Sequence, residues 1–182
     1  MNLKNEYKRV YDLCDKEIAD HLIFCKKNEE YDENFWQLTE TIDKRILKKI
    51  KEDFEYVDPL YGDGWVVKAY GDGQKKRGMK LHIDNINWGA KGKIRDVENR
   101  VVTVSMGLNS NFLGGEFLLE KKKFLPKIGQ AIIVDSSLPH GCSDVINGIR
   151  YVFLSWYRNT PRPDGDVPWH TQFLGSNKKI IN

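Results

Sequence analysis

The sequence has few cysteines, few histidines and no long apolar segment. Its three cysteines, Cys14, Cys25 and Cys142, are odd in number and match no zinc-binding spacing, so the sequence predicts neither a disulfide framework nor a structural zinc site. No apolar run approaches the length of a membrane span. Residues 1–24 are charged throughout and lack the apolar stretch of a secretory signal. These absences predict a cytoplasmic protein with no membrane partner.

What the chain does contain suits one globular domain, residues 1–182. A hydrophobic fraction of 40% and an aromatic fraction of 12% are sufficient for a core. The net charge of +3 is mildly basic, with short basic clusters at residues 75–77 and 121–123. These clusters lack the interleaved aromatic residues of a groove that binds nucleic-acid strands, so a nucleic-acid partner is not expected.

The spacing of apolar residues divides the chain into a helical part and a β-rich part. Apolar side chains recur at three- and four-residue steps in residues 6–26 and 33–54, which predicts two amphipathic helices within an N-terminal part, residues 1–57. From about residue 58 to residue 160, short β-rich runs separated by glycine and proline are typical of an all-β sandwich or barrel. The predicted strands are residues 65–70, 79–84, 100–108, 116–120, 130–135 and 150–157. The tail, residues 161–182, is predicted to be irregular.

Two of the four histidines are candidates for metal binding. His82 and Asp84 are one residue apart in a predicted strand, where alternate side chains share a face. Because 26 residues are acidic, such a spacing arises easily by chance, so it needs a third ligand from another strand. His140 is that candidate, whereas His21 lies in a charged helix and His170 in the irregular tail. Two imidazoles and one carboxylate on one face of an ion are typical of non-haem Fe(II) oxygenases.

Arg150 lies ten residues after His140, at the start of an apolar strand. An arginine that enters the interior of a barrel is costly unless it meets an anion. Its planar guanidinium suits a carboxylate, which it can bind through two parallel hydrogen bonds. Strand alternation puts Leu154 and Trp156 on the same face as Arg150. The pattern predicts a pocket for an acid that chelates the metal and carries a second carboxylate.

With these motifs in order, the sequence resembles the prolyl-4-hydroxylase type of iron(II)/2-oxoglutarate dioxygenases over about residues 60–160. The stretch RVVTVSMGLN is similar to a strand of the hypoxia-sensing prolyl hydroxylases. The matching motifs are Tyr70-Gly71-Asp72-Gly73, His82-Ile83-Asp84-Asn85, Leu108-Asn109, Gly114-Gly115-Glu116-Phe117, Pro139-His140, Gly148-Ile149-Arg150-Tyr151 and Trp156-Tyr157.

The resemblance implies a mainly β fold, a double-stranded β-helix (jelly-roll, cupin-like) core braced by the N-terminal helices. It implies that His82, Asp84 and His140 ligate Fe(II). It further implies that Arg150 binds the distal carboxylate of 2-oxoglutarate and that Tyr70 hydrogen-bonds this cosubstrate. Trp156 is expected either to border the iron pocket or to fill the core.

One position departs from the hypoxia-sensing relatives. Gly107 stands where they carry a tyrosine that helps to hold the distal carboxylate. Arg150 would then depend on Ser105 or Thr103, which share its strand face, or on water. The loop that follows the H-x-D motif contains Trp88 and Arg95, and is either a lid over the substrate or an ordinary surface crossover.

The implied activity is hydroxylation of a C–H bond by O2, with succinate and CO2 as co-products and ascorbate as a candidate reductant. Asp84 favours hydroxylation, because halogenating relatives carry a small residue there. A prolyl residue of a protein or peptide is the expected substrate. The alternatives are a hydroxylase of a free amino acid or other small molecule, and a non-catalytic barrel that binds a metal or ligand.

Overall fold

The computed structural model describes residues 9–53, 60–85 and 100–160. The predicted irregular tail, His170, Trp88 and Arg95 lie outside these residues. The described elements, in chain order, are β1 (Arg9–Asp12), α1 (Lys16–Asn28), α2 (Glu33–Asp53), β2 (Tyr61–Gly71), β3 (Met79–His82), β4 (Arg100–Gly107), β5 (Phe112–Gly114), β6 (Phe117–Leu119), β7 (Lys122–Phe124), β8 (Gln130–Asp135), β9 (His140–Cys142) and β10 (Val145–Arg158).

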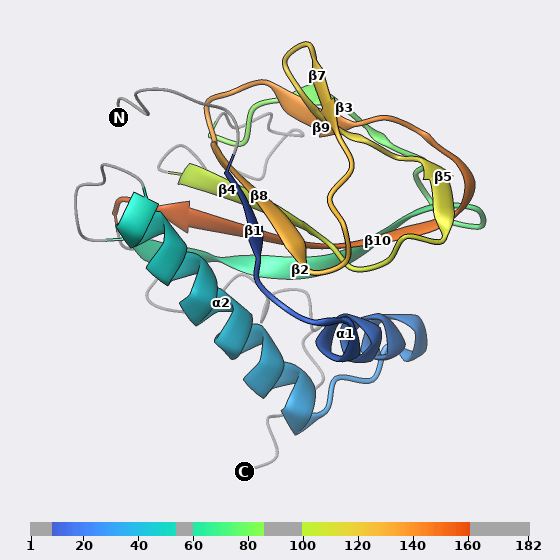
Figure 1. The fold of residues 1–182 in the computed structure, drawn as a ribbon, viewed down its shortest axis with the longest axis horizontal. Helices are drawn as coiled ribbons and strands as arrows, with labels where there is room; N and C mark the ends of the chain where they lie inside the picture. The colour runs from blue at the N-terminus through green and yellow to red at the C-terminus, as the bar shows by residue number, and fades with distance from the viewer. Residues whose placement is uncertain (1–8, 54–59, 86–99, 161–182) are drawn as a thin grey trace, which may run out of the picture.

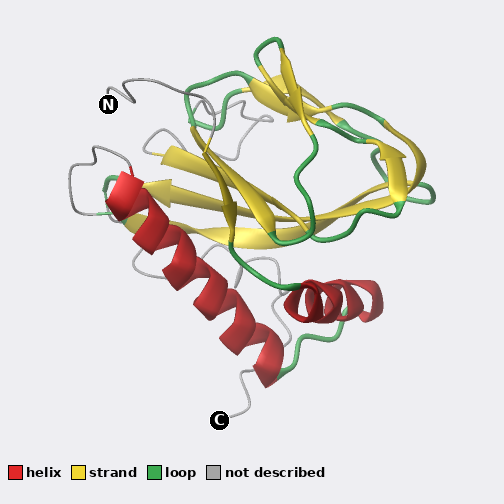
Figure 2. Ribbon diagram, viewed as in Figure 1, coloured by secondary structure: helices red, strands yellow, loops and turns green. Residues whose placement is uncertain are grey.

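The strands form two antiparallel sheets that face each other. The larger sheet has six strands in the order β1-β8-β4-β10-β2, with β5 paired to β10. The smaller sheet has four strands in the order β3-β9-β6-β7. Both helices lie on the side of the larger sheet that faces away from the smaller one (Figure 1). The larger sheet is therefore the middle layer, between the helices and the smaller sheet (Figure 2).

Local sequence explains where both helices begin. The Asp15 carboxylate accepts a hydrogen bond from the backbone N–H of Ile18 at 2.9 Å, and this N-cap starts α1. The Asp32 carboxylate accepts from the N–H of Phe35 at 2.7 Å and caps α2 in the same way. One face of α2 is then buried at regular helical spacing. Its buried residues are Phe35, Thr39, Ile42, Ile46 and Ile50.

The predicted first helix, residues 6–26, is wrong at its start. Residues 9–12 instead form the edge strand β1, in which Tyr11 lies opposite Ala131 of β8. The N–H of Leu13 donates to the carbonyl of Gly129 at 2.8 Å, which continues this pairing to the helix start. The apolar residues of this segment fit either a helix or a strand, and pairing with β8 decides between them.

The main core lies between the helices and the larger sheet. Ile42 and Ile46 of α2 pack with Val104, Met106 and Phe153 of the sheet, all of them fully buried. Each such side chain contributes about 1.5–3 kcal/mol by leaving water. The inner face of the larger sheet is left for the site described below. No helix in the described part of the chain is long and apolar enough to cross a membrane.

Candidate active site

The two candidate histidines lie directly opposite each other on the smaller sheet. His82 of β3 and His140 of β9 are register partners, and their ring centroids are 4.7 Å apart. The Nδ1 of His82 lies 2.9 Å from the carbonyl of Lys80, and the Nδ1 of His140 lies 2.8 Å from the carbonyl of Leu138. A carbonyl accepts only, so each Nδ1 carries the proton and each Nε2 is the ring nitrogen left to bind a metal.

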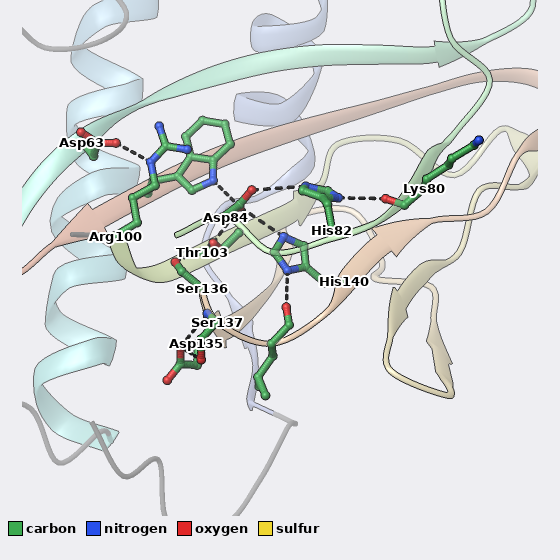
Figure 3. Close-up of polar contacts among 12 residues, drawn as sticks. Asp63, Lys80, His82, Asp84, Arg100, Thr103, Asp135, Ser136, Ser137 and His140 are labelled. Atoms are coloured by element: carbon green, nitrogen blue, oxygen red, sulfur yellow. Dashed lines mark hydrogen bonds and ion pairs between the residues drawn. The ribbon is translucent and has the colours of Figure 1, made fainter. Parts of the chain in front are cut away.

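Asp84 completes the group from a turn rather than from a strand. The strand prediction for residues 79–84 is too long, because β3 ends at His82. The N–H of Asp84 donates to the carbonyl of Ser136 at 2.8 Å, which fixes the turn against the chain after β8. Asp84 Oδ1 lies 3.2 Å from His82 Nε2, and Asp84 Oδ2 lies 3.2 Å from His140 Nε2. The three side chains thus offer ligand atoms within 4.8 Å of one another (Figure 3).

Side chains of the larger sheet hold the Asp84 carboxylate in place by hydrogen bonds. Trp156 Nε1 donates to Asp84 Oδ2 at 2.6 Å, and the Thr103 hydroxyl donates to the same oxygen at 2.8 Å. Ser136 Oγ lies 2.9 Å from the Thr103 hydroxyl and extends this network. Thr103 therefore orients Asp84, whereas the sequence proposed it as a support for Arg150. Trp156 borders the site, one of its two expected positions.

The electrostatics of this group favour an anionic Asp84. Burial by itself would raise the pKa of Asp84, but hydrogen bonds from His140 and His82 hold that pKa well below its usual range. The hydrogen bond with Asp84 likewise raises the pKa of His82. A metal ion binds an unprotonated Nε2, so it would take the place of any proton between Nε2 and Asp84.

Trp156 is itself held by a buried ionic group that sequence reasoning missed. The Arg100 guanidinium carbon lies 4.6 Å from the centre of the Trp156 ring, a cation–π distance. Arg100 Nε donates to Asp63 Oδ2, and Arg158 Nη1 lies 3.5 Å from Asp63 Oδ1. Asp63, Arg100 and Arg158 are all buried. Figure 3 shows the contact between Asp63 and Arg100 as a dashed line.

The candidate ligands His82, Asp84 and His140 line a cavity of about 190 Å³. Arg150 lines the same cavity. Arg150 is 3% exposed, and its Nη2 has no hydrogen-bond partner among the described residues. Burial lowers the pKa of Arg150, yet an arginine stays charged in proteins. Tyr70 is the register partner of Arg150 on β2, and also lines the cavity. The other lining residues are Lys68, Met79, His82, Asp84, Arg100, Thr103, Ser105, Phe117, His140, Gly141, Cys142, Val152, Leu154 and Trp156.

At two glycines the surrounding chain leaves no room for a larger side chain. A Cβ on Gly115, whose φ is +69°, would lie 2.9 Å from Arg150 Cδ, so the glycine makes room for the arginine. A Cβ on Gly107 would lie 2.9 Å from the carbonyl oxygens of Pro126 and Lys127. The chain before β8 therefore fills the space that a tyrosine would need. Ser105 still offers a hydroxyl group on the wall of the cavity.

The residues present fit the groups that the sequence implies. Two neutral imidazoles and a carboxylate that converge are a suitable donor set for Fe(II). A buried cation with an unpartnered N–H, in the same cavity, suits a dicarboxylate such as 2-oxoglutarate. His21, the other described histidine, lies on α1 and lines no part of this cavity.

Comparison with known proteins finds likeness in structure and not in sequence. No protein-family model matches the chain, and no curated protein matches it. A solved viral collagen prolyl hydroxylase from Paramecium bursaria Chlorella virus-1, in a 2OG complex, is 18% identical with a TM-score of 0.69, covering 88% of this chain and 99% of that one.

Two further prolyl hydroxylases show the same likeness. One, from Trichoplax adhaerens in complex with a hypoxia-inducible-factor peptide fragment, is 17% identical with a TM-score of 0.61, covering 83% of both chains. A Pseudomonas putida prolyl-4-hydroxylase is 16% identical with a TM-score of 0.59, covering 85% of this chain and 87% of that chain. The chain therefore has the fold of these enzymes. The predicted mainly β fold, a double-stranded β-helix braced by N-terminal helices, is confirmed.

Proposed function

We propose that the protein is an Fe(II)- and 2-oxoglutarate-dependent dioxygenase that hydroxylates a substrate C–H bond, with succinate and CO2 as co-products. The observation that carries this proposal is the set of side chains that line one cavity. At one end two imidazoles converge on a carboxylate, and at the other a buried Arg150 has an N–H without a partner. An acid that chelates the metal and ends in a second carboxylate would satisfy both ends.

Each residue has a defined task in this proposal. His82, Asp84 and His140 would hold Fe(II), which together with 2-oxoglutarate supplies the activation of O2. Arg150 would bind the distal carboxylate, with Tyr70 and Ser105 as neutral hydrogen-bonding groups beside it. The Tyr70 hydroxyl acts as a donor here, because burial raises its pKa far above neutrality.

We propose a prolyl residue of a protein or peptide as the substrate. The support is the fold shared with three solved prolyl hydroxylases, one of them bound to a peptide. A fold also serves other substrates, so a free amino acid or another small molecule is the second possibility to be tested. A cytoplasmic location remains part of the proposal and rests on the sequence.

The test is succinate formation from 2-oxoglutarate with Fe(II) and ascorbate, offered in turn a proline-containing peptide library and free amino acids. The proposal expects succinate above the metal-only blank, and a peptide that gains one oxygen by mass spectrometry. Succinate with oxidation of a free amino acid would move the substrate to the small-molecule class. No succinate above the blank with any substrate would favour the non-catalytic barrel.

A further inference from the structure

A second group of metal-ligating side chains lies where α1 meets α2, away from the cavity. His21 and Cys25 are four residues apart, so they lie on one face of α1, and Asp32 lies just before α2. His21 Nε2 is 3.1 Å from Asp32 Oδ1 and 3.5 Å from Cys25 Sγ. The ligand atoms of the three side chains lie within 4.8 Å of one another. Asn34 adds its side-chain amide, whose Nδ2 is 3.4 Å from His21 Nε2.

With the Asn34 amide as it is placed, hydrogen bonding does not satisfy all of these neighbours of His21 Nε2. If Nε2 carries a proton, it can donate to Asp32, but it then meets the N–H of Asn34 donor to donor. If Nε2 is bare, it can accept from Asn34 or from the Cys25 thiol, but its lone pair then faces the Asp32 carboxylate. Rotating the Asn34 amide would turn its oxygen towards Nε2, where that oxygen could accept a hydrogen bond from a protonated ring or bind a cation. A cation at the centre would be contacted by lone pairs only.

The distances agree with those around a tetrahedral ion. Zinc binds sulfur at about 2.3 Å and imidazole nitrogen or carboxylate oxygen at about 2.0–2.1 Å. Tetrahedral angles then place nitrogen and oxygen about 3.3 Å apart, and nitrogen and sulfur about 3.6 Å apart. The observed separations from His21 Nε2 are 3.1 Å to Asp32 Oδ1 and 3.5 Å to Cys25 Sγ. Both separations from His21 thus match those around such an ion, and Cys25 and Asp32 offer ligand atoms within 4.8 Å of each other.

We propose that His21, Cys25 and Asp32 form a second metal site, for Zn²⁺ or a similar borderline-soft divalent cation. The Asn34 amide oxygen or water is the fourth ligand. The set of thiolate, imidazole and carboxylate selects such ions over Mg²⁺ and Ca²⁺, which prefer oxygen alone. The ion links the two helices and stabilises the layer that covers the larger sheet. The site departs from the sequence prediction of no structural zinc, because only one of its ligands is a cysteine.

Sulfur distinguishes this site from the active site, whose three candidate ligands are nitrogen and oxygen. Co²⁺ replaces Zn²⁺ in such sites, and a bound thiolate gives it a charge-transfer absorption in the near ultraviolet. The experiment titrates metal-free full-length protein with Co²⁺ and follows this band. The expected result is a band that disappears when Zn²⁺ is added, and that saturates with one Co²⁺ per chain in His82→Ala, in which the active site has lost a ligand. His82→Ala should keep the band and Cys25→Ser should lose it.

Matched variants separate coordination from folding. Asp32→Asn keeps an N-cap residue for α2, because asparagine caps helices as well as aspartate does. Asp15→Asn is its control, since Asp15 caps α1 and does not belong to the group of His21, Cys25 and Asp32. We expect Asp32→Asn to weaken Co²⁺ binding by about 10–100-fold or more, and Asp15→Asn to leave it within about twofold. Cys14→Ala is the control for loss of a thiol elsewhere, and should keep the band.

Three results would overturn the proposal. The first is no thiolate band in the wild-type protein, which would leave His21 and Asp32 as a hydrogen-bonded pair only. The second is a band that survives Cys25→Ser or is lost in His82→Ala, which would place the cobalt beside Cys142 in the active-site cavity. The third is equal weakening by Asp32→Asn and Asp15→Asn, in protein whose circular dichroism is unchanged, which would reduce Asp32 to a helix cap.

Discussion

The two sheets of this protein differ in what supports them. The larger sheet has long strands, its β4 is buried along nearly its whole length, and two helices cover its outer face (Figure 1). The smaller sheet is built from strands of three or four residues, and Leu81 on β3 is 52% exposed. Nevertheless, both candidate histidine ligands lie on the smaller sheet.

The contacts between the sheets explain how the weaker one can carry a precise group. Asp84 follows β3 of the smaller sheet, but its carboxylate accepts hydrogen bonds from Trp156 and Thr103 of the larger sheet. Its N–H donates to Ser136, after β8 of the larger sheet. The larger sheet thus supplies stability on its outer face and orientation on its inner face, while the smaller sheet supplies the imidazoles. This division of tasks can be tested residue by residue.

The largest effect is expected from His82→Ala, which removes a ligand from the smaller sheet. Turnover of 2-oxoglutarate should fall to the metal-only background, because two ligands cannot hold the ion in place. The His82 side chain is 31% exposed, so the free energy of unfolding of the metal-free protein should change by no more than about 1 kcal/mol. Succinate assays under trace-metal control and urea unfolding measure the two quantities.

Leu81→Ala is the matched control for that variant, on the same strand but exposed, and it should keep its turnover. Full activity in His82→Ala would remove the histidine pair from the proposed metal site. A large loss of stability in His82→Ala would show instead that the smaller sheet depends on this residue for its folding.

The opposite result is expected from Ile46→Ala, on the helix side of the larger sheet. Ile46 is fully buried in the main core, so the cavity left by truncation should lower the free energy of unfolding by about 2–5 kcal/mol. Iron binding by the folded fraction should stay unchanged, because Ile46 lines no part of the active-site cavity. Chemical unfolding and metal titration at low temperature check both statements. Weakened iron binding in folded Ile46→Ala would contradict a separation of stability from chemistry.

The same contrast shows why sequence predicted one sheet better than the other. The predicted strand at residues 130–135 agrees with β8, and the helix predicted at 33–54 agrees with α2 to its last described residue. Both segments are long enough to show a period, and both bury a continuous face. The strands β7 and β9 of the smaller sheet, and β5 of the larger one, have three residues each, too few to show alternation, and were not predicted. β5 and β9 exist because partners distant in the sequence pair with them, whereas β7 forms a hairpin with its neighbour β6.

The site was predictable where strand alternation applies, and not where a turn or a tertiary contact decides. Alternation correctly put Arg150, Leu154 and Trp156 on one face, since all three line the cavity. Alternation also placed Asp84 beside His82 on one strand. In the structure β3 ends at His82, and Asp84 reaches the histidines from the turn that follows. Sequence also gave no sign that Thr103 would contact Asp84 rather than Arg150. That choice depends on the register of β4 against β10 and on how closely the sheets approach.

A smaller effect is expected from Arg150→Ala, on the inner face of the larger sheet. A charge-assisted hydrogen bond to a carboxylate contributes about 1.5–3 kcal/mol, so the apparent KM for 2-oxoglutarate should rise about 10–100-fold. Iron affinity, measured without 2-oxoglutarate, should not change. Arg150→Lys keeps a positive charge without the planar pair of donors, so its KM should lie between those of the wild type and Arg150→Ala. An unchanged KM in Arg150→Ala would mean that the cosubstrate carboxylate lies elsewhere.

The smallest effect is expected from Thr103→Val, which replaces the hydroxyl that donates to Asp84 by a methyl group of similar size. Iron affinity should fall about tenfold, because groups that orient a metal ligand contribute about 10–100-fold and Trp156 still donates to the same oxygen. Thr103→Ser is the matched control, since it keeps the hydroxyl and loses only the methyl group. Calorimetry with Mn²⁺ in place of Fe(II) gives the affinity without turnover. If Thr103→Ser lost as much affinity as Thr103→Val, packing rather than the hydrogen bond would be the contribution of β4, and the larger sheet would support Asp84 only by its shape.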